Sequence, residues 1–123
     1  KEELKIQFYG QDIVNRKWFD SLSPFLEFYK ANEDGTFMLV HRSTPAYNTT
    51  NPIWPEFTKP LRSFCNGDYD KTIKVICKDY KTSGRHKTIG LFTTNVRMLV
   101  EGPGSQQNIY MLNNEERMVS YMS

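Results

Sequence analysis

The sequence predicts an all-β fold, an antiparallel sandwich of about eight strands. Apolar and polar residues alternate along several short segments, which is the period of a half-buried strand. Aromatic residues make up 14% of the chain, with 8 Phe and 7 Tyr, and such large flat side chains favour strands. Turn-forming residues separate these segments, and no long amphipathic helix interrupts them. Together these features are typical of an antiparallel sandwich.

In the first half of the chain, turn residues mark where the expected strands end. The apolar residues at positions 26 and 28 face one side of their strand, whereas Glu27 and Tyr29 face the other. Residues 32–35, Asn-Glu-Asp-Gly, have the chemistry of a hairpin turn. Pro and Asn residues recur between positions 45 and 55 and predict a loop, because proline cannot donate to a strand ladder. The expected strands of this half cover residues 4–8, 26–29 and 37–42, and a further one begins at residue 57.

In the second half, the clearest strand covers residues 73–80. Its alternate residues from position 73 onward are Ile, Val, Cys and Asp, so its inner face ends in the carboxylate of Asp79. Gly84 follows in a loop. Thr94 is expected to cap a short helical turn that runs to Leu99. The remaining expected strands cover residues 89–93, 108–112 and 117–122.

Length and composition limit the class of protein. A chain of 123 residues builds one ordinary core and therefore one domain. The mean hydropathy of −0.62 and the lack of a long apolar run argue against a membrane-spanning helix. The net charge of +2 argues against a general nucleic-acid binder. Cys65 and Cys77 each stand beside an apolar residue, so we expect buried structural thiols in a reducing, intracellular compartment.

Five blocks of the sequence, in this order, resemble a C2 domain, and more narrowly the C2 domain of a copine. The second block alone is typical of C2 domains in general. The third block and the Gly-x-His of residues 84–86 are similar to copines, and best to the second of their two C2 domains. The blocks are Ser-Pro-Phe-Leu-Glu-Phe-Tyr at 23–29, Asn-Pro-Ile-Trp at 51–54, Cys-Asn-Gly-Asp at 65–68, Asp-Tyr at 79–80 and Ile-Gly at 89–90.

This resemblance covers nearly the whole chain. It implies a single C2 domain over residues 1–123, folded as an eight-stranded antiparallel β-sandwich of type II-like topology, in which Trp54 is buried. It also implies a neighbouring C2 domain and a von Willebrand A-like domain. Because the chain begins with Lys-Glu-Glu rather than Met, we expect it to be a fragment of a longer copine-like protein.

The same resemblance predicts a degenerate calcium site. In ordinary C2 domains, two loops at one end of the sandwich hold calcium through aspartates. The corresponding positions here are Lys17 and Ser23 in the first loop and Asp79, Lys81 and Lys87 in the later loop. An ammonium about 4 Å from a divalent ion opposes its binding by several kcal/mol, so we expect no calcium cofactor.

The lysines also suggest a function, because calcium in this family partly serves to present positive charge to anionic lipid. Basic groups near an anionic surface contribute about 1 kcal/mol each, and aromatic rings favour the headgroup level. A second interpretation is a solvated basic loop in which Lys81 or Lys87 bonds to Asp79 in place of the ion. A third keeps calcium through Asp79, Asp20 and backbone oxygens. The candidate lipid or partner contacts are Arg16, Lys17, Trp18, Phe19, Lys81, Arg85, His86 and Lys87.

Other patterns are weaker. His41 and Arg42 with nearby Lys30 could form a second basic strip, although ordinary exposed polar side chains account for them better. His86 has no nucleophile at a useful spacing, and no carboxylate dyad or phosphate loop is present, so we expect no enzyme.

The sequence therefore predicts a calcium-independent C2 module that contacts phospholipid membranes from the cytoplasm, with peripheral attachment to their inner face as an option. The alternative is a protein-interaction or interdomain module that binds no lipid.

Overall fold

The computed structural model describes residues 3–11, 13, 22–101, 107–112 and 116–122. Its paired strands are antiparallel, and one short helix, α1 (Val96–Glu101), follows the sixth strand. The predicted antiparallel β-sandwich is confirmed in this mostly β architecture. The strands are β1 (Glu3–Gln11), β2 (Pro24–Ala31), β3 (Phe37–Arg42), β4 (Phe57–Pro60), β5 (Ile73–Asp79), β6 (Lys87–Thr94), β7 (Gln107–Leu112) and β8 (Glu116–Met122).

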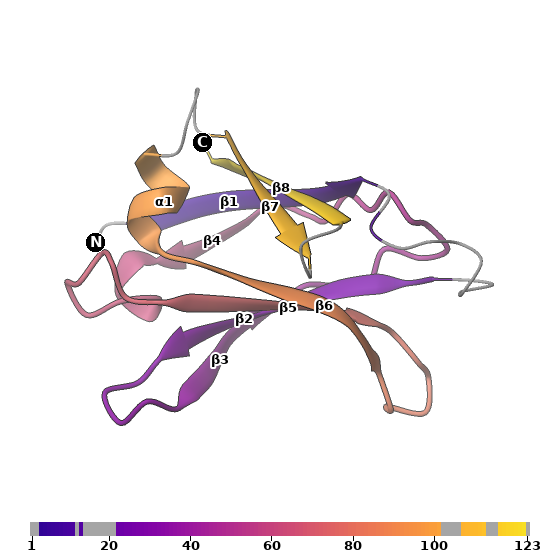
Figure 1. Cartoon of the computed structure of the whole chain (residues 1–123), viewed down its shortest axis with the longest axis horizontal. Coiled ribbons are helices and arrows are strands. Elements are labelled where there is room, and N and C mark those ends of the chain that lie inside the picture. Colours follow the sequence, from indigo (N-terminus) through magenta and orange to yellow (C-terminus); the bar gives the residue numbers. More distant parts are fainter. Residues whose placement is uncertain (1–2, 12, 14–21, 102–106, 113–115, 123) are drawn as a thin grey trace.

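Two sheets form the layers of the sandwich. One sheet has the strand order β4-β1-β8-β7 and the other has the order β3-β2-β5-β6. Figure 1 shows the two layers with α1 at one end and the loop between β5 and β6 at the other. Within the residues that the structure describes, no helix has the length and apolar character needed to span a membrane.

The core lies between the sheets and follows the alternation of the sequence. On β5, Ile73, Val75 and Cys77 are fully buried, and Asp79 continues the same face with 1% of its surface exposed. The predicted inner face that ends in a carboxylate is therefore confirmed. Phe8 of β1 packs edge-on against Phe28 of β2, with ring centroids 5.4 Å apart, and this contact joins the two layers.

Trp54 is buried as predicted, with 2% of its surface exposed. Its indole Nε1–H donates to the carbonyl oxygen of Pro24 at 3.0 Å, which ties the loop before β4 to the start of β2. Cys65 and Cys77 are also buried free thiols, as expected. Burial raises the pKa of the Cys77 thiol, and the charge of Asp79 raises it further, so this side chain stays protonated.

Two local predictions can be compared with the backbone. The Asn-Glu-Asp-Gly turn is confirmed: Asn32 N–H donates to Thr36 O at 2.7 Å, and Gly35 has a φ of 88°, which favours glycine. The prediction that Thr94 caps the helix is wrong. Thr94 is the last residue of β6, and Asn95 accepts the Met98 N–H at 2.7 Å through its side-chain Oδ1. Asparagine caps well because its short side chain reaches back to the first turn.

Candidate functional site

The predicted site lies where β2 begins, β5 ends and β6 begins. Figure 1 shows the β5–β6 loop and the start of β2 at the same end of the sandwich, far from α1. The connection between β3 and β4 joins them there, because Ala46 N–H donates to Pro24 O at 2.9 Å. We call this region the loop end, and its described residues are Ser23, Tyr47, Asp79, Tyr80, Lys81, Arg85, His86 and Lys87.

Asp79, the last residue of β5, is the buried carboxylate of the loop end. Its Oδ1 accepts the backbone N–H of Ser23 at 2.8 Å. Its Oδ2 lies 2.9 Å from the ammonium Nζ of Lys81, and no hydrogen bond of favourable geometry from the described residues reaches this buried oxygen. The Lys81 side chain is 46% exposed, whereas that of Asp79 is 1% exposed. A lysine cation therefore neutralises the carboxylate from the solvent side.

The described donor set does not fit calcium. Calcium requires six or more oxygen ligands, mostly carboxylates and carbonyls. Asp79 is already paired with a cation, and Lys87 is its direct strand partner across β5 and β6. No group of three His, Cys, Asp or Glu side chains able to hold a metal lies within the described residues. The first-loop positions Lys17 and Asp20 lie outside the described residues.

His86 holds the loop between β5 and β6 in place. Its Nδ1 accepts the backbone N–H of Lys81 at 3.0 Å. The imidazole stacks on Tyr80 with centroids 5.0 Å apart and meets the edge of Phe25 at the same distance. A histidine that accepts at Nδ1 is neutral and carries its proton on Nε2. This contact fixes the residue whose ammonium pairs with Asp79.

Tyr47 belongs to the loop end, and sequence reasoning missed it. Its side chain is 65% exposed and its ring lies 6.3 Å from that of Tyr80, nearly perpendicular to it. The next residue, Asn48, donates its backbone N–H to the Ser23 hydroxyl at 3.3 Å. The available signal was a large aromatic residue inside a loop rich in Pro and Asn, which has no role in a strand.

The other predicted lipid or partner contacts fall into two groups: some lie at the loop end, and the rest lie outside the described residues. Lys81, Arg85 and Lys87 are exposed around the loop end, and His86 is partly buried beneath them. The others, Arg16, Lys17, Trp18 and Phe19, lie outside the described residues.

The weaker prediction of a basic strip at His41, Arg42 and Lys30 does not hold as one surface. The His41 ring stacks on Phe57 of β4 with centroids 3.7 Å apart, so it faces the second sheet. Burial lowers the pKa of His41, and the charge of Lys59 lowers it further, which disfavours a cation there. Arg42 instead lies over the outer face of the β3-β2-β5-β6 sheet, where it pairs with Glu27.

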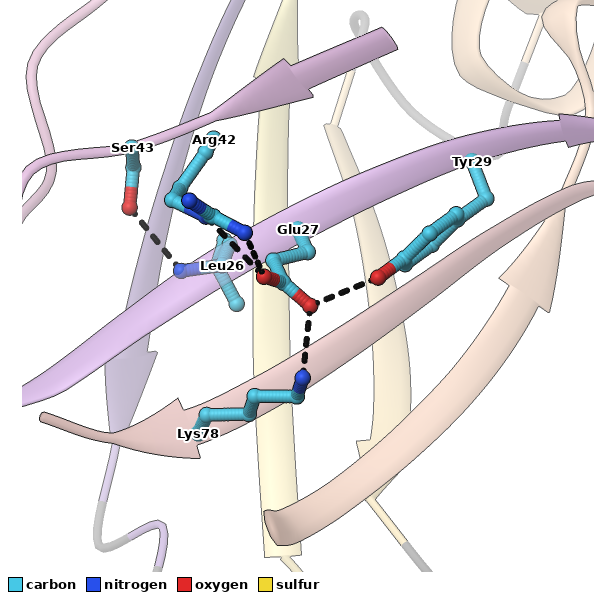
Figure 2. Close-up of polar contacts among 6 residues, drawn as sticks. All are labelled: Leu26, Glu27, Tyr29, Arg42, Ser43 and Lys78. Atoms are coloured by element: carbon cyan, nitrogen blue, oxygen red, sulfur yellow. Dashed lines mark hydrogen bonds and ion pairs between the residues drawn. The ribbon is translucent and has the colours of Figure 1, made fainter. Parts of the chain in front are cut away.

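Glu27 forms a second buried carboxylate site that the sequence did not predict. Although it faces the side of β2 expected from the alternation, its side chain is only 1% exposed. The Arg42 guanidinium donates to Oε2 at 2.9 Å from Nε and 2.6 Å from Nη2. The Lys78 ammonium lies 2.9 Å from Oε1, and the Tyr29 hydroxyl donates to the same oxygen at 2.7 Å. Figure 2 shows the three donors converging on this carboxylate.

These contacts determine how the Glu27 cluster ionises. Burial alone would raise the pKa of Glu27, but hydrogen bonds from Lys78, Tyr29 and Arg42 outweigh it and hold the pKa below its ordinary value. Burial and the hydrogen bond to Glu27 raise the pKa of Tyr29 to about 12. The cluster is therefore a charged, fully bonded unit on the outer face of the sheet.

Comparison with known proteins identifies the architecture. The model of the C2 domain family matches residues 5–111. The C2B domain of BON1, a copine, is similar over 98% of this chain and 87% of its own, at 21% identity and a TM-score of 0.77. A C2 domain of a plant extended synaptotagmin 1 is similar over 98% of this chain and 93% of its own, at 10% identity and a TM-score of 0.64. A structure of CC2D1B, a protein described as coordinating ESCRT-III activity during reformation of the nuclear envelope, is similar over 96% of this chain and 53% of its own, at 12% identity and a TM-score of 0.66.

Proposed function

Because the family model covers most of the chain, this protein belongs to the C2 domain family, and from that premise we propose that it is a calcium-independent module for peripheral contact with anionic phospholipid membranes. Membrane or lipid binding is typical of this family, and such modules are generally non-catalytic. The observation that carries the proposal is the ion pair of 2.9 Å between Lys81 and Asp79. A side-chain cation takes the place that calcium has in ordinary members.

The remaining charges of the loop end support attachment to an anionic surface. Asp79 neutralises the charge of Lys81. Arg85 and Lys87 are both exposed and add positive charge to the loop end. Tyr47 adds an exposed aromatic ring beside them. Each basic residue near an anionic membrane contributes about 1 kcal/mol, and tyrosine is favoured at the headgroup level. Attachment through this end therefore weakens as salt concentration rises.

Vesicle co-sedimentation in chelator tests the proposal. The protein is expected to sediment with vesicles that contain phosphatidylserine, but not with pure phosphatidylcholine vesicles. The double variant Arg85→Glu/Lys87→Glu should lose most of this binding. The matched control Lys5→Glu/Arg62→Glu changes the net charge equally at exposed positions away from the loop end and should bind as the unaltered chain does. Equal binding by both double variants would contradict attachment through the loop end.

Calcium independence has its own test. A ligand that does not bind the native state contributes no linkage stabilisation, so about 1 mM calcium should leave the melting temperature unchanged. A rise of several degrees that chelator reverses would show that other oxygens complete a calcium site. The double variant Lys81→Asp/Lys87→Asp should bind anionic vesicles more weakly in chelator. We expect no full calcium site in it, because Lys17 and Ser23 still occupy the first-loop positions.

The finer assignment is also a proposal. We take the chain to be a single copine-like C2 domain over residues 1–123, most like the second such domain, with eight strands in a type II-like order. The position of β8 between β1 and β7 supports the strand order. A neighbouring C2 domain, a von Willebrand A-like domain and a cytoplasmic location follow from the same resemblance. Mass spectrometry of the endogenous protein from fractionated cells would test the longer chain and its location together.

The second candidate function is a protein-interaction module without lipid binding. One observation favours it: three consecutive apolar residues of β3 are exposed, namely Phe37, Met38 and Leu39. If the unaltered chain does not sediment with anionic vesicles with or without calcium, this second function is the better description.

A further inference from the structure

The backbone of the β5–β6 loop depends on the protonation state of one side chain, that of His86. The pairing of β5 with β6 ends at Asp79 and Lys87, and beyond that pair a side chain closes the loop. The backbone N–H of Lys81 donates to Nδ1 of His86 at 3.0 Å. An imidazolium carries a proton on both nitrogens and accepts no hydrogen bond. Protonation of His86 therefore removes the acceptor that holds Lys81.

The imidazole cannot avoid this loss by turning within its site. Its ring is stacked on Tyr80, with centroids 5.0 Å apart, and meets Phe25 edge-on at the same distance. A half-turn of the ring would bring a carbon atom, rather than a nitrogen, to the Lys81 N–H. Aromatic faces attract cations, so the stack on Tyr80 also accommodates the charged ring. The imidazolium can therefore remain stacked although its bond to the loop backbone is lost.

The charged neighbours of His86 on its own hairpin are mainly cations. Arg85 and Lys87 flank it in the chain, and both are exposed. The carboxylate of this end, that of Asp79, already has the Lys81 ammonium 2.9 Å from its Oδ2. An imidazolium at this position therefore adds to a cationic surface instead of completing an ion pair.

The other elements packed against His86 lead to the same conclusion. From β3, the guanidinium carbon of Arg42 lies 6.0 Å from the centroid of the Phe25 ring that His86 contacts. The carboxylate of Glu27 is bonded to Arg42. Phenols carry no charge between about pH 5 and 8. Two phenols complete the ring stack, and they belong to Tyr80 and Tyr47.

We propose that protonation of His86 strengthens the attachment of the loop end to an anionic membrane, so that this contact is tighter in mildly acidic solution. The inference rests on the proposed function, whose site it regulates. The proton adds one positive charge and frees the backbone of Lys81, whose ammonium is then able to turn from Asp79 to a lipid phosphate. One more charge near an anionic surface corresponds to about fivefold tighter binding. Because binding and protonation are linked, the negative surface in turn favours the charged ring.

Vesicle co-sedimentation at two pH values tests the proposal. Histidine changes its charge between about pH 5 and 8, so the comparison is made at about pH 5.5 and about pH 7.5. The vesicles contain phosphatidylglycerol, whose charge is constant over this range, and chelator and ionic strength are kept the same. The unaltered chain should bind about fivefold more tightly at the lower pH. His86→Asn keeps an oxygen that can accept the Lys81 N–H but takes up no proton, so its binding should be equal at both pH values.

The second histidine of the chain, His41, provides the matched control. His41 stacks on Phe57 and faces the second sheet rather than the loop end. His41→Phe keeps a ring for this stack and removes the same kind of titratable group. This variant should retain the fivefold response to pH.

Nuclear magnetic resonance follows the same event without a membrane and without a variant. As pH falls, the amide resonance of Lys81 should shift with the same midpoint as the imidazole resonances of His86. The amide hydrogen of Lys81 should also exchange faster with solvent in the acidic form, because its acceptor is lost.

The possible failures are distinguishable. Equal binding of the unaltered chain at both pH values would overturn the regulation and leave the membrane contact in place. A response that persists in His86→Asn would assign it to another group. A Lys81 amide that does not follow the titration of His86 would contradict the loop mechanism. No sedimentation at either pH value would remove the proposed function itself and this regulation with it.

Discussion

Two carboxylates in this domain are buried to the same degree but are bonded very differently. Glu27 and Asp79 are each 1% exposed, and each lies near a lysine ammonium at 2.9 Å. Both oxygens of Glu27 accept donors from three side chains that lie on β2, β3 and β5. Asp79 has one backbone donor, from Ser23, and one half-exposed cation. Glu27 therefore links three strands of its sheet, whereas the cation paired with Asp79 is half exposed and can move into solvent.

The contrast follows from where the partners lie. A buried charge is tolerated when all its lone pairs are satisfied, and removal of one partner then leaves an uncompensated group. Glu27 is in the middle of its sheet, where neighbouring strands fix Arg42 and Lys78 in register. Asp79 is at the end of β5, and its cation comes from a loop. The Lys81 side chain is 46% exposed, so the cation paired with Asp79 can exchange its carboxylate partner for water.

The largest expected effect comes from the packing that supports the Asp79 end. Trp54 is buried and its indole holds Pro24, which pairs with Asp79 across β2 and β5. Trp54→Ala should reduce the free energy of unfolding by about 3 to 5 kcal/mol, as large core truncations do. Urea unfolding followed by circular dichroism measures it. A loss well below about 1 kcal/mol would mean that Trp54 does not support the core.

Sequence reasoning predicted Asp79 but missed Glu27, and the reason is physical. Asp79 continues an apolar alternation on one strand, which a local pattern can detect, and the resemblance to C2 domains had singled out the same residue. The alternation also assigned Glu27 to the correct face of β2. Its burial depends on Arg42 and Lys78, which come from two other strands and are set by sheet register. Tyr47 was missed for a similar reason, because only the packed loops bring it beside Tyr80.

The second prediction compares the two carboxylates by the same chemical change, carboxylate to amide. Glu27→Gln should lower the free energy of unfolding by about 3 kcal/mol. The amide NH₂ group that replaces one carboxylate oxygen is itself a donor, so a neighbouring donor loses its acceptor. The loss is measured by urea unfolding at neutral pH. Since the pKa of Glu27 is lowered in the folded state, its contribution is present above about pH 4.5 and is lost as pH falls through the folded value. The variant should therefore show a weaker loss of stability in acid than the unaltered chain.

The third prediction concerns the neutral member of the Glu27 cluster. The pKa of Tyr29 is raised from about 10 when unfolded to about 12 when folded, so its contribution is full below pH 10 and disappears as pH rises toward 12. Tyr29→Phe removes one hydrogen bond to a carboxylate and should reduce stability by about 1.5 kcal/mol at neutral pH. The stabilities of the two chains should converge between pH 10 and 12. A constant difference across this range would mean that the hydroxyl does not bond to Glu27.

The smallest expected effect comes from Asp79→Asn, which completes the comparison. The side-chain oxygen of asparagine can still accept the Ser23 N–H, and the amide group then faces Lys81. Since the Lys81 side chain is 46% exposed, its ammonium can turn into water when the pairing is lost. Ion pairs with an exposed partner contribute about 0 to 1 kcal/mol, so urea unfolding should detect a loss of at most about 1 kcal/mol.

The Asp79→Asn variant also frees the positive charge of Lys81, so binding to anionic vesicles in chelator should strengthen. A loss of unfolding free energy as large as that of Glu27→Gln would mean that Asp79 stabilises the fold as Glu27 does. Unchanged vesicle binding would show that the charge of Lys81 does not contribute to membrane contact.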